Sequence, residues 1–254
     1  MSRALRWINA PSVLPAIVAA IVAAIVPVIV AAIVLALAGC ASTGRGPDAD
    51  LERPPWPPAV EPAGDRTVFE IVEDASSLRV IVAPAGSLAR LGHHHVIGGP
   101  VLSGRVLLGE TADDSRIELA VDVAALVVDR AAWRAEEGLE PLDDDTIEAT
   151  RSNLLGPEVL AVEDHPRIEV RSVSAVGPGW QADVTARVRV RGVVSELVVP
   201  VSVQRDAGRL VAVGAFDVDQ TALGLQPFST AGGALRVADS MRIRFRIVAR
   251  PASG

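Results

Sequence analysis

The sequence predicts an all-β domain, an antiparallel barrel or sandwich with a short helical insert at about 129–155. From Thr67 to Ala249, apolar and polar residues alternate with a period of two, the pattern of strands with one buried and one solvated face. About nine segments show this alternation, and a single interruption divides them. The expected strands are 68–72, 78–83, 101–108, 117–123, 168–173, 182–190, 197–203, 210–216 and 242–247.

The segment at 182–190 shows the alternation most clearly. Its apolar face consists of small or medium side chains, namely Ala182, Val184, Ala186, Val188 and Val190. Its polar face consists of Asp183, Thr185, Arg187, Arg189 and Arg191. Gly192 then marks a tight turn before the next apolar run, so the two segments should form a hairpin.

The interruption from Asp129 to Leu155 loses the alternation and contains residues that favour helices. Asp143-Asp144-Asp145 precede Thr146-Ile147-Glu148-Ala149, and an acidic run before helix-forming residues is an N-terminal capping signal. Gly156-Pro157 should end this helix. A metal site is the alternative interpretation of the acidic triplet, and a solvated helix start is preferred.

The N-terminus has the features of an export leader. Arg3 and Arg6 form a positive start, and residues 13–38 are almost entirely Ala, Val, Ile and Leu. The run ends in Leu37-Ala38-Gly39-Cys40, which resembles the lipobox of bacterial lipoproteins and implies lipid attachment to Cys40. The run exceeds the roughly 7–15 residues usual for a secretory core, so an uncleaved transmembrane anchor is the alternative.

Three regions are therefore expected: a lipoprotein signal peptide at 1–39, a Pro/Gly-rich linker at 40–65, and a β-domain at 66–250. The linker contains Pro54-Pro55-Trp56-Pro57-Pro58 and few branched aliphatics, so we expect an extended spacer that does not order itself. Cys40 is the only cysteine, so the domain has no internal disulfide and depends on burial of its core.

Composition excludes several functions. Every basic residue is arginine, and removal of Arg3 and Arg6 with the leader leaves 22 arginines against 31 acidic residues, a net charge of −9. An acidic domain with dispersed arginines disfavours nucleic acid and electrostatic adhesion to anionic lipid. The absence of lysine excludes P-loop, Schiff-base and kinase chemistry. G-x-S-x-G, H-E-x-x-H and C-x-x-C motifs are also missing.

Three of the four histidines are adjacent. If His93, His94 and His95 lie in a strand, His93 and His95 share a face about 7 Å apart along the chain. This spacing suits two polar groups at the mouth of a pocket, or two metal ligands with His165 as a third. A metal site is the weaker reading, because no acid is close in sequence to the three histidines.

Several stretches, in this order, resemble the YceI-like family of polyisoprenoid-binding proteins. They are 91–97, 103–106, the helical insert, 165–172, the hairpin at 189–201, and 216–225. The resemblance covers about Thr67 to Ala249. Val194-Ser195 stand where the family has Thr-Lys in its turn, and Gln220 and Leu223 replace a usual Arg and Phe, which leaves any head-group contact carried over from relatives in doubt.

The resemblance implies a lipocalin-like β-barrel with a lipophilic tunnel for a long isoprenoid chain, such as a quinone or a prenyl phosphate. The small apolar face at 182–190, four Phe and no Tyr agree with an unfilled interior, although a packed core is the alternative. We expect a carrier or sequestering module with no catalytic residue and no cofactor beyond a bound lipid. The expected ligand-binding residues are His93, His95, Val184, Ala186, Val188, Val190 and Leu225.

Two other function classes stay open: a metal-dependent enzyme that uses His93, His94 and His95, and a structural lipoprotein of the cell envelope. The expected partners are an isoprenoid-type lipid and, through the anchor, a membrane; nucleic acid is not expected, and a homodimer is left open. Ala41 lacks the acidic residue that resembles an inner-membrane retention signal in some bacteria, which favours the outer membrane, facing the periplasm.

Overall fold

The computed structural model describes residues 53–61, 66–206 and 208–252. The predicted export leader and Cys40 lie outside the described residues. Among the residues that the structure describes, no helix is both long enough and apolar enough to cross a bilayer.

Twelve strands form one antiparallel sheet in this part of the chain. They are β1 (Thr67–Ile71), β2 (Ser77–Ala85), β3 (His95–Gly99), β4 (Leu102–Leu108), β5 (Arg116–Asp122), β6 (Val127–Val128), β7 (Arg167–Val176), β8 (Gln181–Val190), β9 (Val193–Asp206), β10 (Arg209–Asp219), β11 (Ser229–Thr230) and β12 (Leu235–Pro251). The helices are α2 (Ala131–Glu136) and α3 (Asp144–Leu155), with 3₁₀ turns η1 (Glu73–Ala75), η2 (Ala89–Leu91), η3 (Thr221–Leu223) and η4 (Ala231–Gly233).

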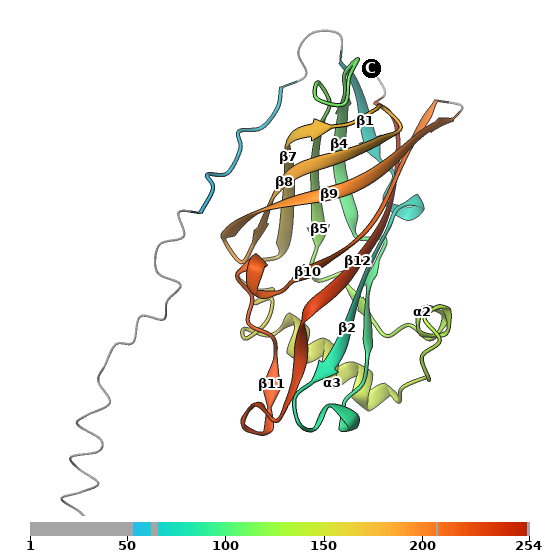
Figure 1. Ribbon diagram of the computed structural model, residues 1–254. Coiled ribbons are helices and arrows are strands. Elements are labelled where there is room, and N and C mark those ends of the chain that lie inside the picture. Colours follow the sequence, from blue (N-terminus) through green and yellow to red (C-terminus); the bar gives the residue numbers. More distant parts are fainter. Residues whose placement is uncertain (1–52, 62–65, 207, 253–254) are drawn as a thin grey trace, which may run out of the picture. The chain divides into compact units, whose positions relative to one another are not determined.

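The sheet closes into a barrel, which decides between the two architectures that the alternation left open. Eight strands follow one another in the order β1-β4-β5-β7-β8-β9-β10-β12, and β12 pairs back onto β1 (Figure 1). The long β12 also pairs with β2, so β2, β3 and β6 continue the sheet beyond the ring. The predicted all-β barrel with a helical insert is confirmed.

All nine predicted strands are present, and β3, β6 and β11 were missed. β3 has the sequence His-Val-Ile-Gly-Gly, whose two glycines break the alternation, and β6 and β11 are two residues each. Such segments are too short or too irregular to produce a period-two signal.

The alternation at 182–190 works as predicted. Every apolar residue of β8 is buried in the barrel, and its polar neighbours lie on the outer wall. At the turn to β9, Arg191 and Gly192 have φ of 49° and 77°. Two successive positive φ values are typical of a type I′ turn, which fits the right-handed twist of a hairpin.

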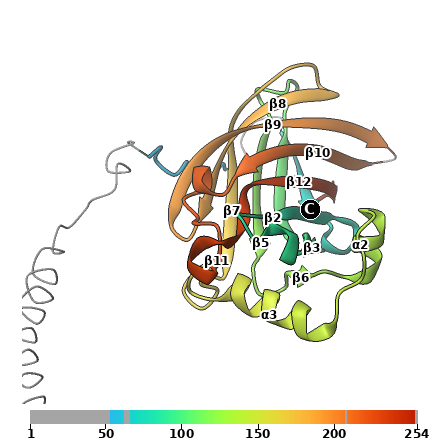
Figure 2. The ribbon, with the colours of Figure 1, turned by 60° about the horizontal axis from the view of Figure 1, so that its bottom comes forward.

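Helix α3 begins where the acidic triplet predicts. The Asp143 carboxylate accepts a hydrogen bond of 2.8 Å from the Thr146 amide, and Asp144 and Asp145 lie in the first turn. Gly156 caps the C-terminal end. The helix lies at the end of the barrel where β11 and the turn after β2 also lie (Figures 1 and 2).

Part of the predicted spacer is ordered on the barrel. Residues 53–61 lie along its outer wall, where barrel arginines donate hydrogen bonds to Pro55, Pro57 and Val60. Composition alone suggests that this stretch cannot order itself. The structure shows that the order is supplied by the arginines of the barrel, which the composition of the linker does not reveal.

Gly104 in β4 is required by the close approach of β5. Its φ is +131°, and a Cβ there would lie 2.2 Å from the Glu118 carbonyl oxygen. We expect Gly104→Ala to lower the free energy of unfolding by roughly 2–3 kcal/mol, measured by urea denaturation. Gly179→Ala is the matched control, because a Cβ at Gly179 meets nothing within 4 Å. Equal stability of the two variants would contradict this account of the β4–β5 contact.

Candidate functional site

The centre of the barrel contains an apolar cavity of about 250 Å³. A single water needs roughly 10–15 Å³ of such space, so the barrel's own side chains do not fill its interior. The wall includes five of the predicted residues, namely Val184, Ala186, Val188, Val190 and Leu225. The aromatic side chains in the lining are Phe216 and Phe245, so small aliphatic groups form most of the wall.

Two residues of this lining are polar, and each makes one hydrogen bond to the backbone. The Ser172 hydroxyl accepts a hydrogen bond of 2.8 Å from the Ile117 amide. The Gln220 side-chain amide donates a hydrogen bond of 2.7 Å to the Ala238 carbonyl. Since every other residue of the lining is apolar, the cavity offers a ligand an almost wholly apolar surface.

A second cavity of about 330 Å³ adjoins the first at the end of the barrel near α3. Val82, Ile97 and Val159 line both cavities. The lining here is mixed, with polar side chains from the His93–His95 segment, α3, β11, β12 and the turn after β10. These polar residues are His93, His95, Thr146, Thr150, Asn153, Gln220, Thr230 and Arg236. We refer to this cavity as the polar mouth.

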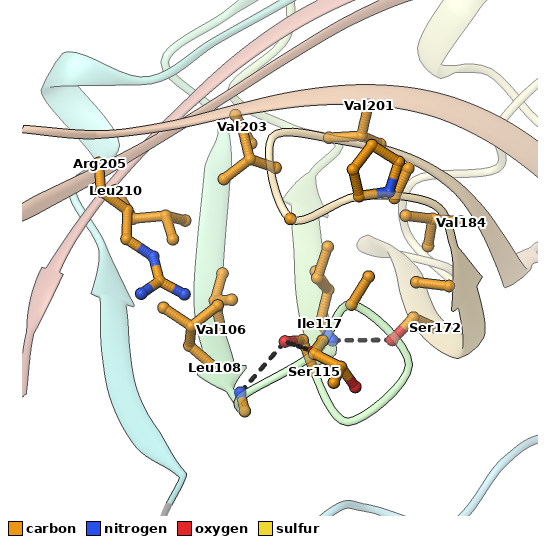
Figure 3. Close-up of a pocket in the computed structure, with 18 of the residues that line it drawn as sticks. Val106, Leu108, Ser115, Ile117, Ser172, Val184, Val201, Val203, Arg205 and Leu210 are labelled. Carbon is orange, nitrogen blue, oxygen red and sulfur yellow. Dashed lines mark hydrogen bonds between the residues drawn. The ribbon is translucent and has the colours of Figure 1, made fainter.

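A third cavity of about 80 Å³ lies at the opposite end and shares Ile117, Val184 and Val201 with the central cavity. Figure 3 shows this end, where valines of β8 and β9 face Val106 and Ile117, and Arg205 lies beside Leu210. The three cavities share lining residues and follow one another along the barrel, and we call this row of spaces the tunnel. Its centre is apolar, and polar side chains line the cavities at both ends.

His95 at the polar mouth is held by a buried carboxylate. Its Nδ1 lies 2.6 Å from Oδ2 of Asp129, whose side chain is completely buried. Asp129 Oδ1 also accepts hydrogen bonds from the Val96 amide at 2.9 Å and from Arg134 at 2.7 Å. Since Nδ1 of His95 is engaged, Nε2 is the ring nitrogen left to meet a ligand.

Burial by itself would raise the pKa of Asp129, because it disfavours the charged form. Hydrogen bonds from His95, the Val96 amide and Arg134 outweigh burial and lower the pKa below its ordinary value. Asp129 is therefore an ionised carboxylate at neutral pH, and Nδ1–H of His95 donates to it.

Arg134 completes this network from α2. Its guanidinium, 4% exposed, donates to Asp129, to the His94 carbonyl and to the Glu140 carbonyl. The network therefore ties the start of β3 to the helical insert and fixes the ring of His95 in place. Such an arrangement orients an imidazole for a hydrogen bond to a polar group in the mouth.

The other predicted residues are distributed as follows. His93 lines the mouth with His95, and their ring centroids are 6.4 Å apart. His165 lies beside Gly192 at the β8–β9 turn and does not line the mouth. In the described part of the chain, no group of three or more His, Cys, Asp or Glu side chains is placed to hold a metal ion.

Asp129 and Arg134 were missed by sequence reasoning. Both lie in the interruption between strands, where no period marks a side chain as buried. One signal is visible only in the structure: Asp129 has a φ of 54°, a left-handed conformation that Asp tolerates better than most residues.

Gln220 and Leu223, which depart from the family pattern, belong to a segment that closes the barrel wall. β9 and β10 pair only between 202–206 and 209–213, and beyond Val213 they diverge (Figure 1). Turn η3 contacts β8, β9 and β10, and Leu223 and Leu225 face the central cavity. Of the two departures, Leu223 therefore adds to the apolar wall, whereas Gln220 places a polar side chain in the lining of both the central cavity and the polar mouth.

Comparisons with known proteins agree with this geometry. A family model described as YceI-like domain matches residues 71–249. Among solved structures, the chain is similar to BcnA from Burkholderia cenocepacia, with 16% identity and a TM-score of 0.52 over 70% of this chain and 98% of that one. No curated protein matches the sequence.

A second solved structure is a polyisoprenoid binding domain from Saccharophagus degradans implicated in plant cell wall breakdown. It shares 15% identity and a TM-score of 0.52 over 73% of this chain and 99% of that one. At such identities the structural likeness supports the barrel fold, whereas the family match spans most of the chain. The chain belongs to the YceI-like domain family.

Proposed function

We propose that this protein is an exported, lipid-anchored module that binds a long isoprenoid chain inside its barrel and acts as a carrier or sequestering protein without catalysis. The observation that carries the proposal is the row of three cavities along the barrel, with an apolar centre that the barrel's own side chains leave unfilled. The family match and the polyisoprenoid binding described for the Saccharophagus degradans domain support the ligand class.

The energetics of the tunnel favour a chain-like ligand. Burial of each methylene-sized group contributes about 0.8 kcal/mol, so a few five-carbon units outweigh any single hydrogen bond. Affinity would therefore come from the tunnel wall. Orientation would come from the polar mouth, where Asp129 fixes the ring of His95 and its Nε2 can accept a hydrogen bond from a hydroxyl of a quinol or phosphate head group.

The proposed lipid anchor is inferred from the sequence of the leader, which ends in a lipobox-like motif at Cys40. Acylation of Cys40 would hold the barrel at a membrane, from which an isoprenoid lipid can be taken without crossing free solvent. The sequence after Cys40 favours the outer membrane, on its periplasmic side.

The test is to purify the full chain from bacterial membranes, extract it with organic solvent and identify the lipid by mass spectrometry. We expect an isoprenoid lipid in near-stoichiometric amount, and an acylated N-terminal cysteine in the mature protein. Cys40→Ser should abolish the acyl mass and membrane retention without changing the barrel. Protein that is free of lipid after mild purification, and that fails to take up a long prenyl lipid from vesicles, would refute the ligand proposal.

A further inference from the structure

The outer wall of the barrel carries a row of charged side chains that are directly opposite one another on neighbouring strands. The row runs Arg105 on β4, Glu118 on β5, Arg171 on β7, Arg187 on β8 and Glu196 on β9. Ion pairs join Arg105 to Glu118 at 2.8 Å and Arg187 to Glu196 at 3.1 Å. Arg171 lies 3.5 Å from Glu118. We call these five residues the charged row.

Residues 53–61 follow the charged row, and we call them the strap. Arg187 donates a hydrogen bond to the Pro55 carbonyl at 2.5 Å and Arg171 to the Pro57 carbonyl at 2.6 Å. Val60 makes two further hydrogen bonds of 2.8 Å, one from Arg105 to its carbonyl and one from its amide to Glu118. Four hydrogen bonds, three of them donated by arginine, therefore hold a nine-residue segment.

A stacked aromatic ring adds to these contacts. The guanidinium of Arg189 lies 4.0 Å from the centroid of the Trp56 ring, and that of Arg171 lies 5.2 Å from it. The four prolines of the strap suit this mode of binding, because they favour an extended chain whose carbonyls have no internal partner. Chain stiffness also reduces the entropy lost when the strap is ordered.

We propose that the charged row is a docking site for the chain's own proline-rich strap, and that docking shortens the tether between the lipid anchor and the barrel. The inference rests on the proposed anchor at Cys40. With the strap docked, Arg53 lies 13 residue steps after Cys40. With the strap released, the barrel begins at Arg66, 26 residue steps after Cys40.

The two states differ in reach. At about 3.5 Å per extended residue, the maximum span of the tether is ~45 Å when the strap is docked and ~90 Å when it is released. Docking therefore restricts ligand exchange to the membrane that holds the anchor, as a sequestering or local carrier module requires. A released strap would give the barrel about twice the reach.

The test compares barrel height above a bilayer for the full lipidated chain and a strap variant. Trp56→Ala removes the stacking, and Val60→Pro removes the amide donor to Glu118 without altering the barrel. Ala59→Pro is the matched control, because Ala59 is exposed and makes no hydrogen bond or ion pair with the described part of the barrel. A dye on Ala215→Cys, on the exposed outer wall of β10, reports energy transfer to acceptor lipids in vesicles.

We expect energy transfer in the Trp56→Ala/Val60→Pro variant to fall by about twofold, and that of the Ala59→Pro control to equal the wild type. Equal energy transfer in all three proteins would overturn the proposal. A second measurement, hydrogen exchange of the Val60 amide, tests docking without the anchor. We expect this amide to exchange at least ~10-fold more slowly in the wild type than in Trp56→Ala.

The two measurements distinguish a failure of the docking proposal from a failure of the anchor proposal. If mass spectrometry shows no acyl group on Cys40, the anchor proposal fails, and with it the effect on reach. In that case slow exchange of the Val60 amide would still establish docking, whereas exchange at the rate of a free peptide would refute docking whether or not the chain is acylated.

Discussion

Replacing Ala186 by phenylalanine should abolish isoprenoid binding and leave the barrel folded. Ala186 is 4% exposed and lines the central cavity, so a larger side chain at this position enters the tunnel. The cavity of about 250 Å³ has room for the added ring, and overpacking of the core is therefore avoided. We expect the free energy of unfolding to change by less than about 1 kcal/mol.

The expected loss of affinity follows from the carbon atoms that the ring displaces. Excluding one five-carbon unit removes about 4 kcal/mol of burial at ~0.8 kcal/mol per methylene-sized group. A difference of 1.4 kcal/mol is tenfold, so the dissociation constant for a long prenyl lipid should rise by about 1,000-fold. Fluorescence titration with a labelled prenyl lipid measures this change.

Thr185→Phe is the matched control. Thr185 precedes Ala186 on β8 and points to the outer wall, opposite Ser174 and Val198. This variant adds a comparable ring without entering the tunnel, so its affinity should equal that of the wild type. If Ala186→Phe binds the lipid as tightly as Thr185→Phe does, the tunnel is not the binding site.

The residues of β8 that line the tunnel could be predicted from the sequence, because they follow from the period-two alternation of a strand. In a strand, alternate residues face the same side, so the small apolar residues of β8 had to share one face of the sheet. Closure of the sheet into a barrel then turned this face inward. The alternation itself does not distinguish a barrel from a sandwich, because closure depends on the pairing of β1 with β12, which are far apart in sequence.

The polar contacts of the site could not be predicted in this way, because no sequence pattern marks them. Asp129 meets His95 and Arg134 through a turn whose geometry depends on one left-handed residue. The strap contacts Arg105, Arg171 and Arg187. The alternation predicted the polar face for Arg187, but it did not predict the strap as the partner of these arginines. Contacts of this kind depend on tertiary packing and leave no periodic signal.

Substitution of Asp129 should produce the largest loss of stability. Asp129→Ala removes the acceptor of three donors and leaves the guanidinium of Arg134 buried without a counter-charge. Breaking a buried pair by removing one partner costs about 3–5 kcal/mol. Alanine also tolerates the φ of 54° poorly. Urea denaturation, followed by the fluorescence of the buried Trp133 on α2, measures this loss.

Asp129→Asn is the informative control, because asparagine has the same shape and accepts a left-handed conformation. Its amide oxygen can still accept from the Val96 amide, so the loss should be smaller, about 1–3 kcal/mol. A further change of Arg134→Met in this variant should recover part of the stability, since it removes the unpaired charge. Additive losses in the double variant would show that the two residues do not interact.

The pH dependence of stability gives an independent test of the same network. The pKa of Asp129 is lower in the folded protein than its ordinary value near ~4, so its contribution to stability is fully present above that value. The contribution is lost as the pH falls through the folded pKa, because protonation then favours the unfolded chain. The free energy of unfolding should therefore fall more steeply below about pH 4 in the wild type than in Asp129→Asn. Identical acid profiles would mean that the Asp129 carboxylate is not the charge that holds His95 and Arg134 in place at the mouth of the tunnel.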